Sequence, residues 1–273
     1  SSNVAKAKQA TSRKKLIDKL TIDDLKPSSR RFPYVAFKPN REIGKNVLEI
    51  KNLSKTIEGE KILDDFSLTV NPGDKIAFVG QNHYAKTVLF QIIAGEMEPD
   101  EGTFTWGVTT SLSYFPKDNS KMFKEDETMV DYLQQFSNED DDTFVRSFLG
   151  RMLFSGDEAL KNCQVLSGGE RVRVVLAKMM LEGANCMIFD EPTSHLDLES
   201  IQALNNGLID FKGVLLFNSH DHEFVSSIAN RIIEFTPAGI IDKMEGFEDY
   251  LADQSANELR EKAYKDDKRI ILL

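Results

Sequence analysis

The sequence lacks three features that would place it in a membrane or in an oxidising compartment. No run of about 18 apolar residues occurs, so no transmembrane helix is predicted. The N-terminal stretch SSNVAKAKQATSRKK has no apolar core of the kind that marks a secretory signal. The two cysteines, Cys163 and Cys186, are too few for a disulfide framework. These absences favour a cytoplasmic protein and predict no membrane partner.

Internal repeats and low-complexity segments are absent too. What is present is ordinary globular composition over 273 residues, with 41% hydrophobic and 29% charged residues. A chain of this length and composition can bury a substantial core and forms one large domain or two small ones.

Charge is distributed unevenly along the chain. Residues 1–55 carry 14 Lys and Arg against 5 Asp and Glu, a net charge of +9. The whole chain has a net charge of −10, so the remainder carries −19. Such asymmetry indicates a basic segment with its own partner, and nucleic acid is one candidate. A solvated linker helix with scattered lysines is the alternative.

Three segments are expected from the pattern of apolar residues and of prolines. Residues 1–45 are predicted to be the end of an inter-domain linker, with a basic helix over residues 4–20 followed by a proline-rich extended stretch. Residues 46–252 are predicted to form the main domain, including a helical subdomain over about 122–182. Residues 253–273 form a charged tail, either helical or disordered.

Strand and helix patterns alternate within residues 46–252. VLEIKNLSKTI and KILDDFSLTV read as strands of an antiparallel portion, and KIAFVG, CMIFDE and GVLLFNSH read as buried strands. Helical patterns follow each buried strand. This alternation predicts an α/β fold with a mixed, mainly parallel sheet.

A phosphate-binding loop is indicated by the stretch FVGQNHYAKTVLF. Gly80, Lys86 and Thr87 fit the template G-x-x-x-x-G-K-[ST], with a strand before them and a helix expected to open on Lys86 and Thr87. Ala85, however, fills the second glycine position, and His83 is a bulky residue in a loop that should wrap an anion. By itself the stretch leaves open an intact site, a damaged one or a coincidence.

Two further stretches carry polar residues where a ligand could be held. LSGGE, residues 166–170, opens a helix, where backbone N–H groups attract anions, although such a helix start is common. CMIFDEPTSHLD ends a buried strand with Asp190 and Glu191, at the edge where α/β sheets place their ligands. Asp190 is a candidate Mg²⁺ ligand, and Glu191 a candidate general base. An acidic loop cap is the plainer alternative.

Another buried strand ends in FNSHD, which contains His220. This histidine could contact a terminal phosphate or orient a water, or it could be an ordinary polar residue at a strand end. His220 and His222 could begin a metal site, but no third ligand at a suitable spacing is evident in the sequence.

Taken in order, the four stretches resemble the ATP-binding-cassette ATPases: phosphate loop, LSGGE signature, IFDEPTSHLD and switch histidine. The resemblance covers about residues 46–252 and implies that ATP and Mg²⁺ are the cofactors and ATP hydrolysis the activity. It implies Glu191 and His220 as catalytic residues, and Thr87 and Asp190 as Mg²⁺ ligands. It also implies that each site is completed by the signature of a second cassette. The implied ATP-binding residues are Gly80, Gln81, Asn82, Ala85, Lys86, Thr87, Val88 and Lys117, and the implied signature residues are Ser167, Gly168, Gly169 and Glu170.

EPTSHLD beside SHDHEF is similar to the ABC-F proteins, and in particular to their YbiT/YkpA-like branch. These proteins have two cassettes in one chain, joined by a linker, and no membrane domain. The resemblance implies that this chain is the end of the linker plus the second cassette. It further implies action on the ribosome, as a translation or ribosome-protection factor, with rRNA and tRNA contacted by the basic linker.

Three departures from the family pattern concern the nucleotide. Ala85 replaces glycine, Ile57 replaces the aromatic residue expected to stack on adenine, and Lys117 replaces the glutamine that bridges Mg²⁺ and water. Lowered ATP affinity or slow turnover is therefore expected. Two alternatives remain open, the nucleotide-binding subunit of an ABC transporter and a non-catalytic, ATP-gated clamp.

Overall fold

The computed structural model describes residues 32–137, 139 and 141–265. The chain divides into two units, residues 1–32 and 33–273, and every element described below belongs to the second. The helix expected over residues 4–20 lies outside the described residues, as does the end of the charged tail after residue 265.

A three-stranded antiparallel sheet is formed by strands on both sides of the phosphate loop in the sequence. Its order is β2–β1–β4, with bounds Glu60–Val70, Leu48–Ile57 and Glu101–Trp106. On β1, Leu48 and Ile50 are buried and pair with Val70 and Leu68 of β2. This alternation of buried and exposed residues is the one that the sequence pattern predicts for a half-buried sheet.

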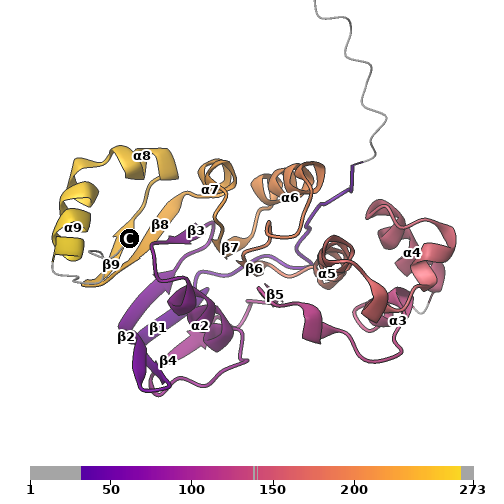
Figure 1. Cartoon of the computed structure of the whole chain (residues 1–273), viewed down its shortest axis with the longest axis horizontal. Helices are drawn as coiled ribbons and strands as arrows, with labels where there is room; N and C mark the ends of the chain where they lie inside the picture. The colour runs from indigo at the N-terminus through magenta and orange to yellow at the C-terminus, as the bar shows by residue number, and fades with distance from the viewer. Residues whose placement is uncertain (1–31, 138, 140, 266–273) are drawn as a thin grey trace, which may run out of the picture. The chain divides into compact units, whose positions relative to one another are not determined.

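The second sheet has six strands in the order β5–β6–β7–β3–β8–β9 (Figure 1). All neighbours pair in parallel except β8 and β9, which form an antiparallel hairpin. The predicted α/β fold with a mainly parallel sheet is thereby confirmed. The strand bounds are β3 Lys75–Val79, β5 Leu112–Phe115, β6 Cys186–Asp190, β7 Val214–Asn218, β8 Arg231–Thr236 and β9 Gly239–Lys243.

Strands β6 and β7 are buried at every residue, which explains their nearly continuous apolar sequences. Because β3, β6 and β7 run parallel, their carboxyl ends meet at one edge of the sheet. The phosphate loop follows β3, Glu191 follows β6 and His220 lies two residues beyond β7. The fold therefore gathers three distant sequence stretches at that edge.

Helices α2 to α7 lie in connections between strands, and α8 and α9 follow the last strand, β9 (Figure 1). None in the described part of the chain is long and apolar enough to cross a membrane. The helical subdomain expected over about 122–182 contains the α-helices α3, α4 and α5, and two 3-10 segments lie between α4 and α5. The helix bounds are α2 His83–Ile93, α3 Met129–Gln134, α4 Asp142–Arg151, α5 Gly168–Glu182, α6 Leu198–Asp210, α7 His222–Ile228, α8 Phe247–Ala252 and α9 Gln254–Lys265; the 3-10 segments are Ser120–Met122, Gly156–Leu160 and Cys163–Val165.

Residues 33–45, predicted to be the end of a linker, pack within the second unit. The ring of Phe37 is buried and meets Phe189 of β6 and Phe211 edge-on. The Tyr34 amide donates to the carbonyl oxygen of Arg151 at the end of α4 (2.8 Å). This segment therefore connects helix α4 to the core around β6.

Candidate functional site

Asn218 ties the ends of β6 and β7 together. Asp190 and Asn218 are direct neighbours in the parallel ladder. The Asn218 side-chain amide donates to Asp190 Oδ1 (2.8 Å), and its oxygen accepts from the Glu191 backbone N–H (2.7 Å). One buried amide thus fixes both the side chain of Asp190 and the backbone of Glu191.

Glu191 has an unusual backbone conformation. Its φ of 52° lies in the left-handed region, which costs a residue other than glycine roughly 1–3 kcal/mol. The side chain is only 3% exposed, and its Oε1 lies 3.1 Å from His220 Nε2. Strain of this kind persists where the surroundings impose it, and here it turns the carboxylate toward the histidine.

Two carboxylate oxygens are buried without a partner. Asp190 Oδ2 and Glu191 Oε2 are hidden from solvent, and neither has a hydrogen-bond partner among the described residues. The Thr87 hydroxyl donates to Asp190. A hydroxyl and a carboxylate with a spare oxygen are hard oxygen donors, so Thr87 and Asp190 fit Mg²⁺.

Two opposite charges approach each other at this edge of the sheet. Burial raises the pKa of Asp190, while hydrogen bonds from Asn218 and Thr87 and the ammonium groups of Lys117 and Lys86 oppose that rise. Burial likewise lowers the pKa of Lys86, and the charges of Glu191 and Asp190 oppose that change. A bound phosphate with its metal would compensate both desolvated charges.

The phosphate loop begins at a position that only glycine can fill. Gly80 has a φ of +101°, and a Cβ added there would lie 2.3 Å from the carbonyl oxygen of Phe235 on β8. Lys86 is 3% exposed, and its Nζ donates to the Gly80 carbonyl oxygen (3.0 Å). The Lys86 side chain therefore folds back over the loop in which it is expected to bind phosphate.

Helix α2 begins at His83, three residues earlier than expected. Asn82 is its N-cap, and the Asn82 side-chain oxygen accepts from the Ala85 N–H (3.0 Å). Ala85 is itself fully buried, so its methyl group packs into the core. A glycine at position 85 would leave the backbone free to wrap an anion. With alanine there, the residue is part of helix α2.

Three backbone N–H groups of the loop already have partners within the chain. That of His83 donates to the Gln81 carbonyl oxygen (2.9 Å), and that of Ala85 to Asn82. The Gln81 N–H donates to the hydroxyl oxygen of Tyr264 on α9. A phosphate bound in the loop would need these same N–H groups as donors. Binding an anion therefore requires that their hydrogen bonds within the chain are broken first.

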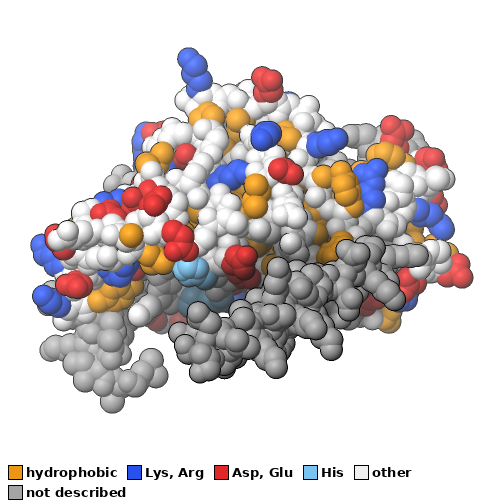
Figure 2. Space-filling view, turned by 90° about the horizontal axis from the view of Figure 1, so that it is seen from above, with side chains coloured by type: hydrophobic (Ala, Val, Ile, Leu, Met, Phe, Trp, Pro, Cys, Tyr) orange, Lys and Arg blue, Asp and Glu red, His pale blue; other side chains and the backbone are white. Residues whose placement is uncertain are grey.

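His83 and His220 face each other across the site. Their ring centroids are 4.4 Å apart. Burial lowers the pKa of His83 to about 4, and the charge of Lys86 acts in the same direction. The imidazole of His83 is therefore neutral at neutral pH. Histidine side chains also reach the surface in Figure 2, on a face where acidic and basic side chains are intermixed.

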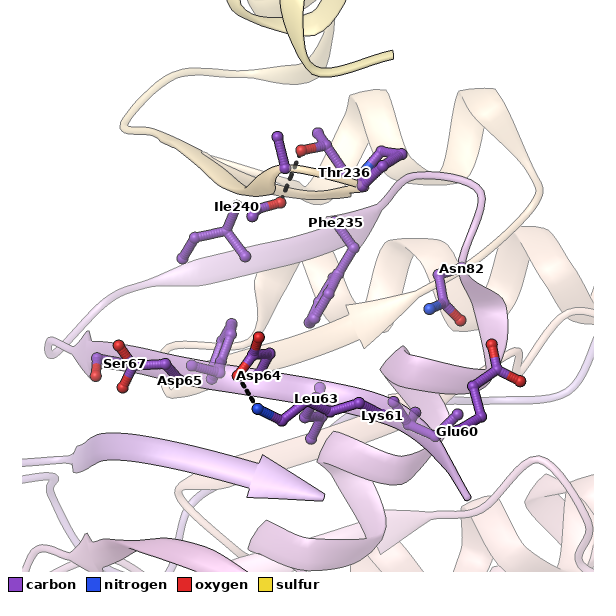
Figure 3. Close-up of a pocket in the computed structure, with 15 residues that line it drawn as sticks. Glu60, Lys61, Leu63, Asp64, Asp65, Ser67, Asn82, Phe235, Thr236 and Ile240 are labelled. Carbon is purple, nitrogen blue, oxygen red and sulfur yellow. Dashed lines mark hydrogen bonds and ion pairs between the residues drawn. The ribbon is translucent and has the colours of Figure 1, made fainter. Parts of the chain in front are cut away.

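A cavity of about 490 Å³ adjoins the loop at Asn82 (Figure 3). It lies between β2 and the β8–β9 hairpin, with Phe235 in its wall and a Lys61–Asp64 ion pair (2.5 Å) along β2. Its size is that of a small-ligand pocket. Ile57, at the position expected for the stacking aromatic, packs against the core of the domain.

The signature begins helix α5. Ser167 is the N-cap and forms a capping box with Glu170, in which the Ser167 N–H donates to Glu170 Oε2 (2.8 Å). A Cβ on Gly169 would lie 3.0 Å from the carbonyl oxygen of His195. Glu170 Oε1 lies 3.5 Å from Lys161 Nζ, and Gly168 and Gly169 lie beside His195. The structure thus joins the signature to the EPTSHLD segment.

Sequence reasoning missed two residues of this site. Asn218 is one, although a polar residue at the end of an apolar strand is a usable signal. Tyr264 is the other: it lies in a charged tail, and no local pattern connects it to the phosphate loop. Its hydroxyl also lies 3.4 Å from Glu234 Oε1, and Arg260 donates to the same carboxylate (2.8 Å).

Comparison with known proteins gives the family. The ABC transporter family matches residues 63–194. The "Uncharacterized ABC transporter ATP-binding protein YkpA" of Bacillus subtilis is 62% identical over 253 residues, which are 92% of this chain and 47% of YkpA. The "Probable ATP-binding protein YbiT" of Escherichia coli O157:H7 is 41% identical over 252 residues, which are 92% of this chain and 48% of YbiT.

A relative with a named role matches over a shorter stretch. The "Energy-dependent translational throttle protein EttA" of Escherichia coli K12 is 35% identical over 213 residues, which are 76% of this chain and 38% of EttA. The chain therefore spans about half the length, or less, of the curated relatives that it matches.

Solved structures agree on the fold. An inward-facing metal-chelate-type ABC transporter superposes with a TM-score of 0.61 at 20% identity, covering 80% of this chain and 89% of that one. A dimeric ATP-binding cassette, MJ0796 with ADP and Pi, superposes with a TM-score of 0.58 at 19% identity, covering 69% of this chain and 94% of that one. The fold, the family match and the relatives together show that this chain is an ATP-binding domain of the ABC transporter family, and they confirm its resemblance to the ABC-F proteins.

Proposed function

We propose that this chain binds ATP with Mg²⁺ and, completed by a second cassette, hydrolyses ATP slowly. The observation that carries the proposal is the cluster at the strand ends. Asp190 and Glu191 each keep one buried, unpartnered oxygen beside the ammonium group of Lys86. A phosphate–metal ligand satisfies this arrangement, since it supplies both negative charge for Lys86 and a cation for Asp190.

Each residue of the cluster has a distinct role in this proposal. Lys86 holds the phosphates, while Thr87 and Asp190 hold Mg²⁺, which neutralises phosphate charge when bound. Glu191 accepts a proton from the attacking water, and His220, 3.1 Å away, orients that carboxylate. Lys117, whose charge already acts on Asp190 and His83, contacts phosphate directly.

A titration with a fluorescent ATP analogue tests the site assignment. Lys86→Met keeps the buried apolar stem but removes the charge, so affinity should fall roughly tenfold or more. Lys121→Met, an exposed lysine outside the cluster, should bind as the parent does. Equal affinity in the parent and in Lys86→Met, with both folded by circular dichroism, would sink the assignment of Lys86.

ABC domains work as dimers or with a second cassette, and this chain covers half or less of its relatives. We infer that the full-length protein carries another cassette, whose signature meets this ATP while Ser167, Gly168, Gly169 and Glu170 meet the other. In the same proposal residues 1–45 are the end of the linker between the cassettes, and the protein acts on the ribosome in the cytoplasm. The name of EttA, a translational throttle protein, and the +9 charge of residues 1–55 support this proposal.

Co-sedimentation of the full-length protein tests the partner. With an ATP analogue that resists hydrolysis, it should pellet with ribosomes and not with membrane vesicles. Raising the salt concentration should weaken the association steeply, because Lys and Arg contacts to phosphate release counterions. Pelleting with membrane vesicles alone would favour the alternative of a transporter subunit.

A non-catalytic clamp remains the second candidate, and one observation favours it. The N–H groups of Gln81, His83 and Ala85 are engaged within the chain, which weakens the grip on phosphate. The clamp and the slow ATPase differ only in turnover, so phosphate release separates them.

A further inference from the structure

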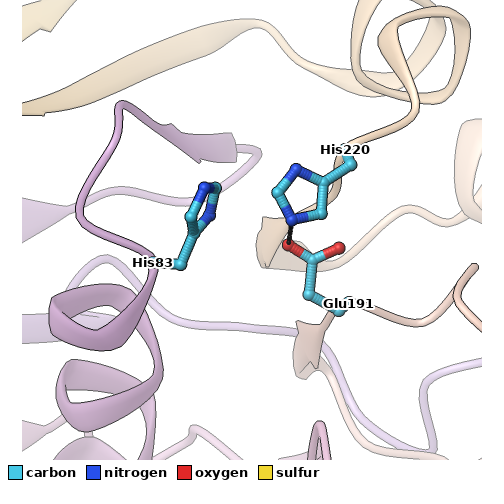
Figure 4. A group of neighbouring side chains, drawn as sticks. All are labelled: His83, Glu191 and His220. Carbon is cyan, nitrogen blue, oxygen red and sulfur yellow. Dashed lines mark ion pairs between the residues drawn. The ribbon is translucent and has the colours of Figure 1, made fainter. Parts of the chain in front are cut away.

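Three metal-binding side chains converge at the mouth of the site. His83 comes from the start of α2, Glu191 from the end of β6 and His220 from the segment after β7 (Figure 4). One ligand atom from each lies within 4.8 Å of the others. His83, a residue of the phosphate loop, therefore lies beside Glu191 and His220 at the strand ends. The spacing of the three residues in the sequence does not indicate this proximity.

We propose that His83, Glu191 and His220 form a binding site for a divalent transition metal of the Zn²⁺ type. Two imidazoles and one carboxylate are a donor set that suits Zn²⁺, with a fourth position left for water. Mg²⁺ prefers an all-oxygen shell, so it would not compete well here. This site is separate from the Thr87–Asp190 pair assigned to Mg²⁺.

The geometry needs only a small adjustment. Zn²⁺ bonds of about 2.1 Å set tetrahedral ligand atoms roughly 3.4 Å apart, so ligand atoms that lie within 4.8 Å of one another must approach by up to about 1.4 Å. Both histidines are exposed to solvent at the mouth of the site, whereas Glu191 is buried and its backbone N–H is held by Asn218. Its Oε2 has no partner in the described part of the chain, and a cation bound at this mouth would satisfy it.

Within the described residues, the other two histidines lie at other places. The sequence has four histidines and two cysteines, and both cysteines are buried. His222 lies 3.6 Å from Glu248, and His195 lies beside Gly168. His220 therefore combines with His83, and not with its sequence neighbour His222.

Metal at this site would oppose the proposed ATPase. It would occupy Glu191 and His220, the groups proposed to activate and orient water. It would also tie the loop to the strand ends through His83. The binding itself requires no nucleotide, so it can be tested whether or not the chain binds ATP.

The test is metal titration of the nucleotide-free chain after removal of metal with a chelator. Zn²⁺ should bind at one equivalent and raise the unfolding temperature, and Co²⁺ should give the intense visible absorption of a four-coordinate ion. His83→Ala should lose the Co²⁺ signal. It should also weaken Zn²⁺ binding by roughly 10–100-fold or more, because removing even a residue that only supports a metal ligand costs that much affinity. His222→Ala, the matched control, should bind as the parent does.

Three results would overturn the proposal. One is equal Zn²⁺ affinity in the parent and in His83→Ala, with both variants folded. Another is a Co²⁺ spectrum typical of six-coordinate, water-rich surroundings. The third is displacement of stoichiometric Zn²⁺ by millimolar Mg²⁺, which would place the metal on Asp190.

Discussion

The two halves of the candidate site differ in what they leave unsatisfied. At the ends of β6 and β7, Asp190 and Glu191 each bury one oxygen with no partner in the described chain. In the phosphate loop, by contrast, Gln81, His83 and Ala85 have already given their N–H groups to other atoms of the chain. The strand ends therefore bury unpartnered oxygens, whereas these three amides of the loop are already bonded within the chain.

This difference has an energetic meaning. A buried polar group without a partner costs about 1–3 kcal/mol, and a ligand that satisfies it recovers that cost. A loop whose amides are satisfied gains little from binding, because each new bond replaces an existing one. Metal-directed affinity should therefore survive at the strand ends, while phosphate affinity is reduced at the loop.

The largest expected effect on activity comes from substituting Glu191 at the end of β6. Glu191→Gln keeps the shape of the side chain but cannot accept a proton, so phosphate release by the full-length protein should fall about 100-fold or more. ATP binding should change little, because the ammonium of Lys86 is retained. Glu223→Gln, an exposed acid on α7, is the control. If the parent releases no phosphate above the background of Lys86→Met, the chain is a clamp.

The strand-end half was readable from the sequence. CMIFD is apolar up to Asp190, and α/β sheets place their ligands at the carboxyl ends of their strands, so a site was expected at Asp190 and Glu191. The resemblance to the ATP-binding-cassette ATPases added His220 to it. What the sequence did not show is how Asn218 bridges Asp190 and Glu191. That bridge depends on the register between β6 and β7, a contact between residues 28 positions apart.

The loop half was predicted less well. The substitution at Ala85 was visible, but the helix was expected to open on Lys86. Asn82 is of a residue type favoured at the N-cap, so it is a local signal that helix α2 starts at His83. The contact of Tyr264 with Gln81 joins residues far apart in the chain, so no local signal could predict it.

Introducing glycine into the loop should leave its amides without partners, as the carboxylate oxygens at the strand ends are. In the double variant His83→Gly and Ala85→Gly, the first turn of α2 is weakened and its N–H groups become available to phosphate. ATP affinity should rise roughly tenfold, while the free energy of unfolding falls by about 2 kcal/mol, near 1 kcal/mol for each helical glycine. Nucleotide titration and urea unfolding measure the two quantities.

The control for this pair is Gln91→Gly, farther along the same helix. It should lower the free energy of unfolding by about 1 kcal/mol and leave ATP affinity unchanged. If Gln91→Gly raises the affinity as much as the double variant does, helix stability governs binding, and the state of the loop amides does not.

The smallest expected effect tests a single amide. Tyr264→Phe removes the hydroxyl that accepts from the Gln81 N–H, so this amide becomes available and ATP affinity should rise about threefold to tenfold. Tyr250→Phe is a close control, because the Tyr250 hydroxyl donates to the same Glu234 carboxylate and, in the described structure, does not bond the Gln81 N–H. An equal rise in both variants would assign the effect to Glu234. A rise in Tyr264→Phe alone would show that helix α9 restrains the loop through one backbone hydrogen bond.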